Sequence, residues 1–402
     1  MKLGIGAIFR DEYCYVIEWL AHHMVAGFDK FFIADNGSHD GTRELLEALK
    51  QARLVELIYQ PVLPENAQIF AYNRILEFSL SSIDVLIFID ADEFLVHDSF
   101  ILGEVPKHLE QLFSDSTIDM VCLNWRCFGS SGLENQNEGL VIERFERCLG
   151  DLNGSIELLP VQSRTVNNHV KSAVRVSRVN KIDNVHVFFL NSGYKIVNCN
   201  GNQIESFVWP IDGIFQRASL SGLIDRIEPS PLRINHYVVK SKEEFLKKMK
   251  RGSAMGTIEN FERNEEFFKY HDFDDSRFTF PDQWICAVKK KISEIYDILD
   301  HTDLNVNIFG CLDIVNEFEC AGWLVRQNGN ASNLMVSIFV NGVHQDYSLC
   351  KFYRPDVKDH GFSLDGICGF RYTHQKPLSI GDVVEVLVFG NKFRFENFST
   401  VI

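Results

Sequence analysis

The chain has 402 residues, of which 46% are apolar and 24% charged, and its formal net charge is −15. This composition is that of an ordinary globular protein, and the length predicts two domains or one large domain with an appendage. The acidic balance excludes a general nucleic-acid binder, which would present a basic face, and no stretch approaches the roughly 20 apolar residues of a membrane span.

The cysteines and the N-terminus bear on the compartment. Ten cysteines are scattered singly and none forms a CxxC pair, so the sequence predicts free thiols rather than a zinc site. The first residues, MKLGIGAIF, enter a strand pattern directly and lack a cleavable export signal. We therefore expect a cytoplasmic protein with reduced thiols.

The first 90 residues alternate between strand and helix patterns. Asp11 is expected to cap the first helix and Gly27 to end it. Strand–helix alternation predicts βαβ units and a parallel sheet, so the fold class is α/β. Strands are expected at 3–9, 31–34, 55–59 and 85–89, and helices at 11–26, 42–49 and about 68–80.

One expected strand ends in two carboxylates. Val85–Ile89 is an unbroken apolar run, typical of a strand buried on both faces, and Asp90 and Asp92 follow it. Ligands of open α/β sheets bind beyond the carboxyl ends of strands, and paired carboxylates suit Mn²⁺ or Mg²⁺. A plain strand-end turn is the alternative. The same spacing at Asp272 and Asp274 follows no buried strand and predicts only a polar loop.

Further motifs follow in order along the first 300 residues. They are Arg10-Asp11-Glu12, Glu18-Trp19, Asp35–Thr42, Asp90–Phe94, Trp125–Gly132, Lys171-Ser172, His186, Asn235–Ser241 and Lys248–Arg251. This set resembles the GT-A glycosyltransferases, most closely their family 2-like and family 92 branches. The resemblance implies a GT-A fold, a Rossmann-like and mostly parallel sheet flanked by helices. It also implies sugar transfer from a nucleotide donor, favouring a UDP-sugar, with inversion. The usual Arg-Asn-Glu triplet is Arg10-Asp11-Glu12 here, so the role of position 11 stays open.

Beyond about residue 300 the apolar pattern has a period of two. Leu334–Val340 followed by Asn341-Gly342 predicts a hairpin, and Val383–Phe389 with Lys392–Phe398 predicts a second strand pair. Such short strands predict a small all-β sandwich, and the stretch resembles one found after bacterial glycosyltransferase domains. We expect a GT-A transferase domain over residues 1–302 and a β-sandwich accessory domain over 303–402.

Three residues are the candidate ligands of a Mn²⁺ or Mg²⁺ cofactor: Asp90, Asp92 and His236. The resemblance implies that Asp92 binds the metal directly, that Asp90 reaches the ribose or the metal, and that a histidine such as His236 completes the shell. A core histidine at a strand end is the alternative for His236. His22 and His23 point about 100° apart on a helix and are expected to be structural.

The donor would be held by polar residues at the strand ends and by basic residues. Arg10 and Asp35 follow the first two strands and are candidates for phosphate, uracil or ribose, although Asp35–Thr42 is also a good turn and helix cap. The expected diphosphate contacts are Lys171, Lys240, Lys248 and Arg251. The alternative for these four residues is a solvated basic face of the protein.

Trp125 and Gly129 mark the expected acceptor side, because an indole plane suits the apolar face of a sugar ring. The base that deprotonates the acceptor is sought among Glu134, Glu138 and Glu143, which spacing does not separate. Alternatively, the glycine-rich turn is only a tight loop.

Three functions remain open at this point. The leading one is a metal-dependent glycosyltransferase acting on a glycan or lipid-linked acceptor, without nucleic acid and with peripheral membrane contact left open. An Asp-x-Asp phosphohydrolase would carry its nucleophile on the first strand of its sheet, whereas Asp90 follows about the fourth. A non-catalytic glycan-binding protein on a transferase fold would differ only in a missing base.

Overall fold

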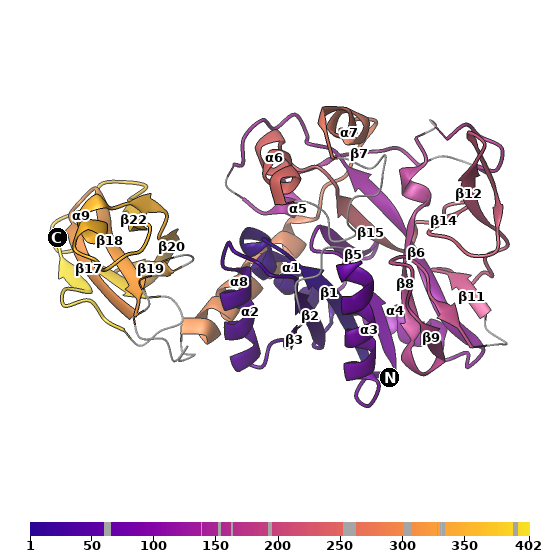
Figure 1. The fold of residues 1–402 in the computed structure, drawn as a ribbon, viewed down its shortest axis with the longest axis horizontal. Coiled ribbons are helices and arrows are strands. Elements are labelled where there is room, and N and C mark those ends of the chain that lie inside the picture. The colour runs from indigo at the N-terminus through magenta and orange to yellow at the C-terminus, as the bar shows by residue number, and fades with distance from the viewer. Residues whose placement is uncertain are drawn as a thin grey trace. The chain divides into compact units, whose positions relative to one another are not determined.

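A computed structural model gives the fold in two compact units (Figure 1). The first comprises residues 1–37 and 54–293, and the second comprises residues 38–53 and 294–402. The expected boundary between residues 302 and 303 lies outside the described residues and stays a prediction. The structure describes the chain except 60–65, 138, 152–153, 162–163, 192–194, 252–262, 301–307, 328, 330, 332–333 and 389–392.

An eleven-stranded sheet organises the first unit. Eight of its strands follow the order β16-β7-β6-β8-β4-β1-β2-β3. The other three lie off this path: β11 and β15 each pair with β6, and β5 pairs with β15. Strands β4, β1, β2 and β3 are parallel, as the βαβ pattern predicts. The bounds are β1 Leu3–Phe9, β2 Phe31–Asp35, β3 Glu56–Tyr59, β4 Val85–Phe88, β5 Glu93–His97, β6 Ile118–Phe128, β7 Arg147–Cys148, β8 Val170–Arg175, β11 Lys195–Asn198, β15 Leu232–Tyr237 and β16 Ser276–Arg277.

Strand β8 interrupts the parallel order. It runs antiparallel to both β4 and β6 and lies between them. The sheet is therefore mixed, and β8 places residues from the middle of the chain beside the end of β4.

The helices of the first unit cover this sheet. Helix α3 packs on β1, β2 and β3, where the Tyr72 ring lies 4.4 Å from that of Phe88 at the end of β4. Burial of Val85–Phe88 on both faces explains their unbroken apolar run. The bounds are α1 Tyr13–Ala26, α3 Ala67–Ser79, α4 Glu104–Phe113, α5 Val141–Arg144, α6 Lys242–Arg251, α7 Glu265–His271 and α8 Asp282–Asp300, whose last turns belong to the second unit.

Helix α1 differs from the prediction at its start and agrees at its end. Its N-cap is Glu12, not Asp11, which adopts a left-handed φ of 51° before the helix begins. Gly27 ends the helix with φ 113°. His22 and His23 are fully buried and their rings bond to backbone atoms of Leu95, which confirms the structural role predicted for them.

Smaller sheets complete the first unit. Strand β9 (Val179–Lys181) pairs with β10 (Phe189–Leu190), and β12 (Phe207–Ile211) pairs with β13 (Ile214–Ala218) and β14 (Leu223–Ile224).

A buried carboxylate joins α1 to the short helix α5. Both Glu18 carboxylate oxygens accept hydrogen bonds, at 2.9 Å from the Val141 backbone N–H and at 3.1 Å from that of Ile142. These are N-terminal amides of α5, where the helix dipole favours an anion. Burial nevertheless raises the pKa of Glu18 to about 7, against the opposing effect of those two bonds.

We expect Glu18 to make stability fall as pH rises. The unfolded carboxyl loses its proton near pH 4.5 and the folded one near 7, so between these values the folded state binds more protons. The unfolding free energy of wild type minus that of Glu18→Gln should therefore fall by about 3 kcal/mol between pH 4 and pH 8. Urea titrations at several pH values measure it, and a pH-independent difference would contradict the prediction.

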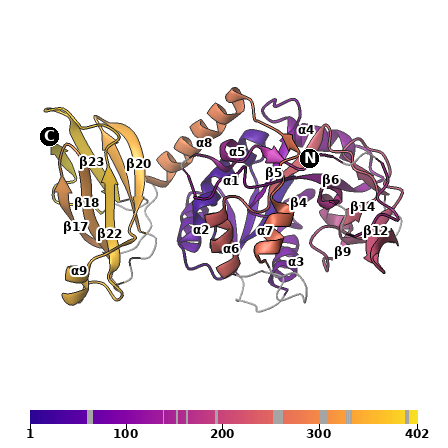
Figure 2. The ribbon, with the colours of Figure 1, turned by 90° about the horizontal axis from the view of Figure 1, so that it is seen from above.

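The second unit holds the β-sandwich that the period-two pattern predicts (Figure 2). Sheets β17-β18-β22-β21 and β20-β19-β23-β24 enclose one apolar core that includes Leu324, Val336 and Val386. The bounds are α2 Thr42–Gln51, β17 Ile308–Val315, β18 Glu319–Arg326, β19 Met335–Val340, β20 Val343–Leu349, β21 Phe352–Tyr353, α9 Pro355–Asp359, β22 Ile367–Thr373, β23 Val383–Val388 and β24 Ser399–Val401.

One predicted hairpin of the sandwich is confirmed and one is wrong. Asn341 and Gly342, both at positive φ, turn β19 into β20 as expected. Strand β23 pairs instead with β24. Residues 393–398, expected to be that partner, are not a strand, and the buried Phe395 joins the core there.

Within the described part of the chain, no helix combines the length and the apolar character that a membrane crossing needs. All ten cysteines are free thiols.

Candidate active site

The candidate site begins where three neighbouring strands end. Asp35 closes β2 opposite Phe9 of β1, Arg10 follows β1, and Asp90 lies just beyond β4 on the other side of β1. Because parallel strands end at the same edge of a sheet, the three polar side chains share that edge. The sheet therefore brings together residues separated by as many as 80 positions.

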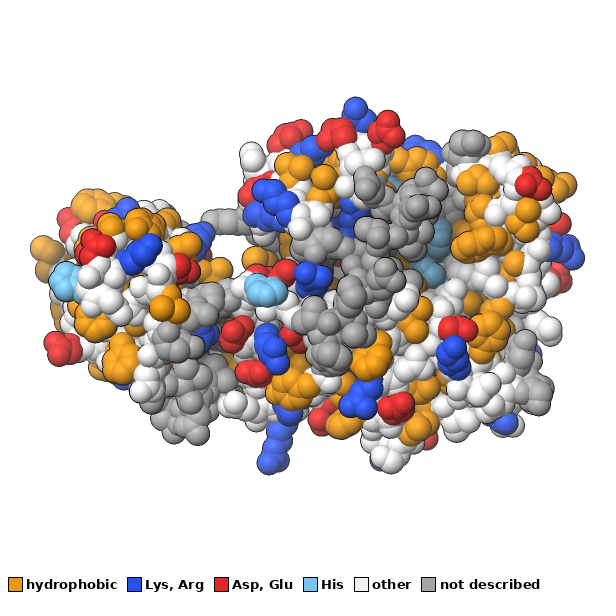
Figure 3. Space-filling model, in the orientation of Figure 1, with side chains coloured by type: hydrophobic (Ala, Val, Ile, Leu, Met, Phe, Trp, Pro, Cys, Tyr) orange, Lys and Arg blue, Asp and Glu red, His pale blue; other side chains and the backbone are white. Residues whose placement is uncertain are grey.

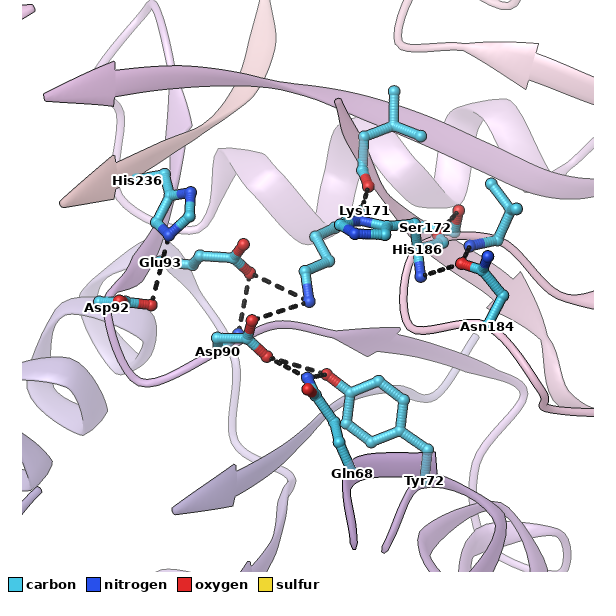
Figure 4. Close-up of polar contacts among 12 residues, drawn as sticks. Gln68, Tyr72, Asp90, Asp92, Glu93, Lys171, Ser172, Asn184, His186 and His236 are labelled. Atoms are coloured by element: carbon cyan, nitrogen blue, oxygen red, sulfur yellow. Dashed lines mark hydrogen bonds and ion pairs between the residues drawn. The ribbon is translucent and has the colours of Figure 1, made fainter. Parts of the chain in front are cut away.

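The Asp90 carboxylate is held from both sides (Figure 4). Its Oδ1 accepts hydrogen bonds from Gln68 Nε2 at 2.6 Å and Tyr72 Oη at 3.0 Å, both on α3. Its Oδ2 lies 3.1 Å from the Lys171 ammonium on β8. The Trp19 indole also donates to the Asp90 carbonyl at 3.0 Å. Asp90 is thus fixed by side chains from three elements.

Lys171 and Glu93 form a fully buried ion pair behind Asp90. Their side chains are 0% exposed and the Lys171 Nζ lies 3.8 Å from Glu93 Oε2, which also accepts from the Asp90 backbone N–H at 2.8 Å. Burial, with Asp90 and Asp92 nearby, raises the pKa of Glu93 well above its usual value, against the effect of Lys171. Burial opposes the charge on Lys171, yet Asp90 and Glu93 raise its pKa. Lys171 was expected to contact the donor diphosphate, but its ammonium is directed at the carboxylates of Asp90 and Glu93.

Asp92 lies between a histidine and a lysine. Strand β15 runs antiparallel to β5 with His236 opposite Glu93, which brings the His236 ring to Asp92. His236 Nε2 is 3.5 Å from Asp92 Oδ1, and Lys248 Nζ on α6 is 2.5 Å from Oδ2. Burial disfavours the charge on Asp92, but Lys248 and His236 hold the pKa of this carboxyl well below its usual range.

Asp92 and His236 fit part of a metal shell. Their facing oxygen and nitrogen are donors that Mn²⁺ accepts, and Mg²⁺ or Mn²⁺ sites of this kind are completed by substrate phosphates and water. His236 Nδ1 is buried and has no hydrogen-bond partner in the part of the chain that the structure describes. Among the described residues, no group of three or more His, Cys, Asp or Glu converges on one point. Asp90, the third expected ligand, instead has its oxygens bonded to α3 and β8.

The other expected donor contacts have different surroundings. Asp35 Oδ2 accepts from the Gly37 N–H at 3.2 Å, so Asp35 does form the turn that was its alternative role. Arg10 Nε lies 3.9 Å from Asp11 Oδ2. Lys240 is buried and its ammonium lies 3.9 Å from the centre of the Tyr15 ring. The side chain of Arg251 lies outside the described residues.

Trp125 on β6 lies among histidines. Its ring stacks on His169 at 4.8 Å and 18°, and its centre is 4.3 Å from that of His236 and 5.3 Å from that of His186. One face of the indole is thus covered by an imidazole, so a sugar would meet this wall of rings rather than an open plane. Figure 3 shows histidine atoms in a recess beside the part of the unit that carries β12.

Gly129 is required by close backbone packing. A Cβ there would clash with the backbone nitrogen and oxygen of Phe273. The next residue, Ser130, donates its N–H to Asp272 Oδ1 at 2.7 Å. Ser131 follows with a left-handed φ of 53° and continues the turn. The segment around Asp272 is the polar loop expected from sequence, and it anchors this turn.

The glutamates considered as bases differ in their surroundings. Glu134 is exposed. Glu143 accepts hydrogen bonds from the N–H of Leu140, the N-cap of its helix, at 3.2 Å and from the Lys289 ammonium at 2.7 Å. Glu138 lies outside the described residues. Neither described glutamate contacts Asp90 or Asp92.

Several residues at this site were not assigned a role from sequence. Gln68 and Tyr72 are four apart, so one face of α3 presents both, but nothing in that spacing identifies Asp90 as their partner. Glu93 and His186 belong to the sequence motifs described above, but the motifs predicted no role for either residue. His169 lies next to β8 and would have required the antiparallel placement of that strand to be known.

Comparison with known proteins gives one family. The family model of glycosyltransferase family 92 matches residues 6–277, more than half of the chain. No curated protein matches the chain.

Solved structures of S. aureus TarS are also similar. TarS aligns over 98% of this chain and 77% of its own, at 10% identity and TM-score 0.31. TarS 1–349 in complex with UDP aligns at 15% identity and TM-score 0.28, and in complex with UDP-GlcNAc at 13% and 0.27; both cover 44% of this chain. The chain spans just under half the length of these TarS 1–349 chains, 47% and 46%. At such identities and scores the likeness indicates nothing about ligands.

Proposed function

The chain belongs to glycosyltransferase family 92 and is a glycosyltransferase, and on this premise we propose that it uses a UDP-sugar and Mn²⁺ or Mg²⁺. The acceptor of the proposed reaction is a glycan or a lipid-linked sugar, and the anomeric configuration inverts. The observation that carries the proposal is the position of Asp92 beyond β4, between His236 and Lys248. A carboxylate, an imidazole and a cation gathered beyond a strand end support the binding of a metal ion and a donor diphosphate there.

Asp92 and His236 would hold the ion in this proposal. When bound, the ion would neutralise charge on the leaving diphosphate. Lys248 holds Asp92 ionised and provides a second positive charge at the same point. Asp90, fixed by Gln68, Tyr72 and Lys171, would accept a hydrogen bond from the donor ribose rather than bind the ion.

The nucleotide would extend from Asp90 along the strand ends toward Asp35. Strand order supports this direction, because β1 and then β2 follow β4 on that side of the sheet. Strands β8 and β6 lie on the other side of β4 and carry Lys171 and Trp125, so the acceptor would approach from there.

We expect UDP to stabilise the protein only in the presence of Mn²⁺ or Mg²⁺. A ligand that binds only the folded state at 100 times its dissociation constant adds about 2.7 kcal/mol to the unfolding free energy. Thermal unfolding is measured with UDP and Mn²⁺, with each alone, and with UDP in excess EDTA. ADP with Mn²⁺ is the control for base selectivity. Equal stabilisation by UDP in EDTA would exclude the metal, and no stabilisation by UDP under any condition would exclude this donor class.

A further inference from the structure

The ring and the backbone of His186 are fixed by contacts with surrounding residues. Its Nδ1–H donates to the Val170 carbonyl at 2.9 Å, and its backbone carbonyl accepts from Ser172 Oγ at 2.6 Å. Its backbone N–H donates to Asn184 Oδ1 at 2.8 Å. A Cβ on Gly222 would come within 2.7 Å of the ring, so a glycine is needed for the imidazole to lie there. Backbone and side-chain contacts thus fix both the position and the tilt of the ring.

These contacts leave one ring nitrogen available. With the proton on Nδ1 bonded to a carbonyl, Nε2 carries the lone pair of the neutral imidazole. Nε2 has no hydrogen-bond partner among the described residues, and the side chain is half-buried. His186 therefore offers a proton acceptor whose orientation is fixed by the nitrogen opposite.

His186 lies on the side of β4 from which the acceptor would approach. It bonds to Val170, whose neighbour Lys171 pairs with Asp90, and its ring is 5.3 Å from that of Trp125. Figure 4 shows the imidazole beside the Lys171 side chain, with Asp90 and Asp92 in the same view. The nucleotide side, marked by Asp35, is on the opposite side of β4.

We propose that His186 is the catalytic base of the transfer, an inference that rests on the proposed function. The acceptor hydroxyl oxygen attacks the anomeric carbon of the donor sugar, and its proton passes to Nε2. The new carbon–oxygen bond forms as the bond from that carbon to the diphosphate breaks, and the diphosphate leaves with that electron pair. The imidazolium formed keeps its Nδ1–H on the Val170 carbonyl, which stabilises the added charge.

The charges around His186 agree with this role. Burial, and then Lys171 and His169, lower the pKa of His186 well below its usual value, with a smaller effect of His236 in the same direction. The base is therefore unprotonated before the donor binds. A bound diphosphate beside Lys248 would add negative charge to the site and raise that pKa toward the working pH, where proton transfer is most effective.

The experiment uses the full chain and the donor that wild type hydrolyses fastest among UDP-glucose, UDP-galactose and UDP-GlcNAc, with water as acceptor. His186→Asn keeps an N–H for Val170 but has no basic nitrogen, and His186→Gln is a second variant in case the first does not fold. Both should lose at least about 100-fold in kcat, while KM and the stabilisation by UDP with Mn²⁺ stay as in wild type. Imidazole in the buffer should restore turnover to His186→Ala.

His108→Asn is the control, because the His108 ring is also bonded to a backbone carbonyl, that of Cys199 at 2.7 Å, and His108, on α4, is not among the residues of the candidate site. It should keep kcat within about threefold of wild type, a change of under 1 kcal/mol. The inference is overturned if either folded His186 variant keeps more than a tenth of kcat, if His108→Asn loses as much, or if imidazole restores nothing. If the variants contradict the inference but wild type binds UDP with Mn²⁺, only the role of His186 is wrong and the proposed function stands. If wild type neither binds nor hydrolyses any of the donors, the proposed function and the inference are both wrong.

Discussion

Asp92→Asn is expected to reduce donor turnover by two or more orders of magnitude while the protein stays folded. The substitution keeps the volume and removes the charge that faces both His236 and Lys248. Stabilisation of a leaving diphosphate amounts to several kcal/mol, and each 1.36 kcal/mol is tenfold in rate. Turnover is measured as UDP release at saturating Mn²⁺, and folding by circular dichroism.

The matched control is Asp84→Asn, at the amino end of the same strand. Asp84 is exposed, and its carboxylate accepts a hydrogen bond from the Lys2 N–H at 2.7 Å. Its substitution should leave turnover unchanged. If Asp92→Asn keeps more than about a tenth of wild-type turnover, a loss of under roughly 1.4 kcal/mol, Asp92 does not hold the ion.

Glu244→Gln should lower the unfolding free energy by about 3 to 5 kcal/mol, the usual cost of breaking a buried ion pair. Arg144 donates two hydrogen bonds to Glu244, each at 2.9 Å, and the side chains are 7% and 1% exposed. Tyr15 Oη and Ser241 Oγ donate to the same carboxylate at 2.8 and 2.5 Å. Burial opposes the charge on Glu244, but these bonds lower the pKa of its carboxyl to about 2. The side chain is therefore ionised at neutral pH, and Glu244→Gln removes that negative charge.

The neighbouring Glu243 is the control for that variant. It is on the same helix and pairs with Lys247 at 2.9 Å, but the pair is exposed, and Glu243→Gln should cost under about 1 kcal/mol. Adding Arg144→Met to Glu244→Gln should recover much of the loss, because the unpaired buried cation is then removed. Urea unfolding of the variants measures these differences. Equal losses for Glu243→Gln and Glu244→Gln would contradict the assignment.

Local patterns in the sequence predicted most of the fold. The buried run before Asp90, the helix that Gly27 ends and the turn at Asn341-Gly342 each depend on a few consecutive residues, whose periodicity and backbone preferences are visible in the chain. The error at Asp11 concerns an element end, where neighbouring residues compete for the same role. The error in the sandwich concerns a whole strand, because residues 393–398 form no strand and β24 follows them.

The site itself was only partly predictable, because its contacts join distant segments. Asp90 and Asp92 follow a recognisable strand, but their partners Lys171 and Lys248 are 81 and 156 positions from them in sequence. Periodicity assigns a residue to a face of its own element and does not identify what lies opposite. Lys171 therefore suggested a phosphate contact from sequence, whereas antiparallel β8 directs it at two carboxylates.

The antiparallel insertion of β8 also bears on how the chain folds. Its pairs with β4 join residues nearly 90 positions apart, so a large loop must close before that edge of β4 is covered. Until then Val85–Phe88 would expose an apolar strand with unpaired backbone groups, a template for association with other chains. A nascent or truncated chain ending before residue 175 is thus expected to need chaperone protection, and the Lys171–Asp90 contact would form in the same late step that removes this risk.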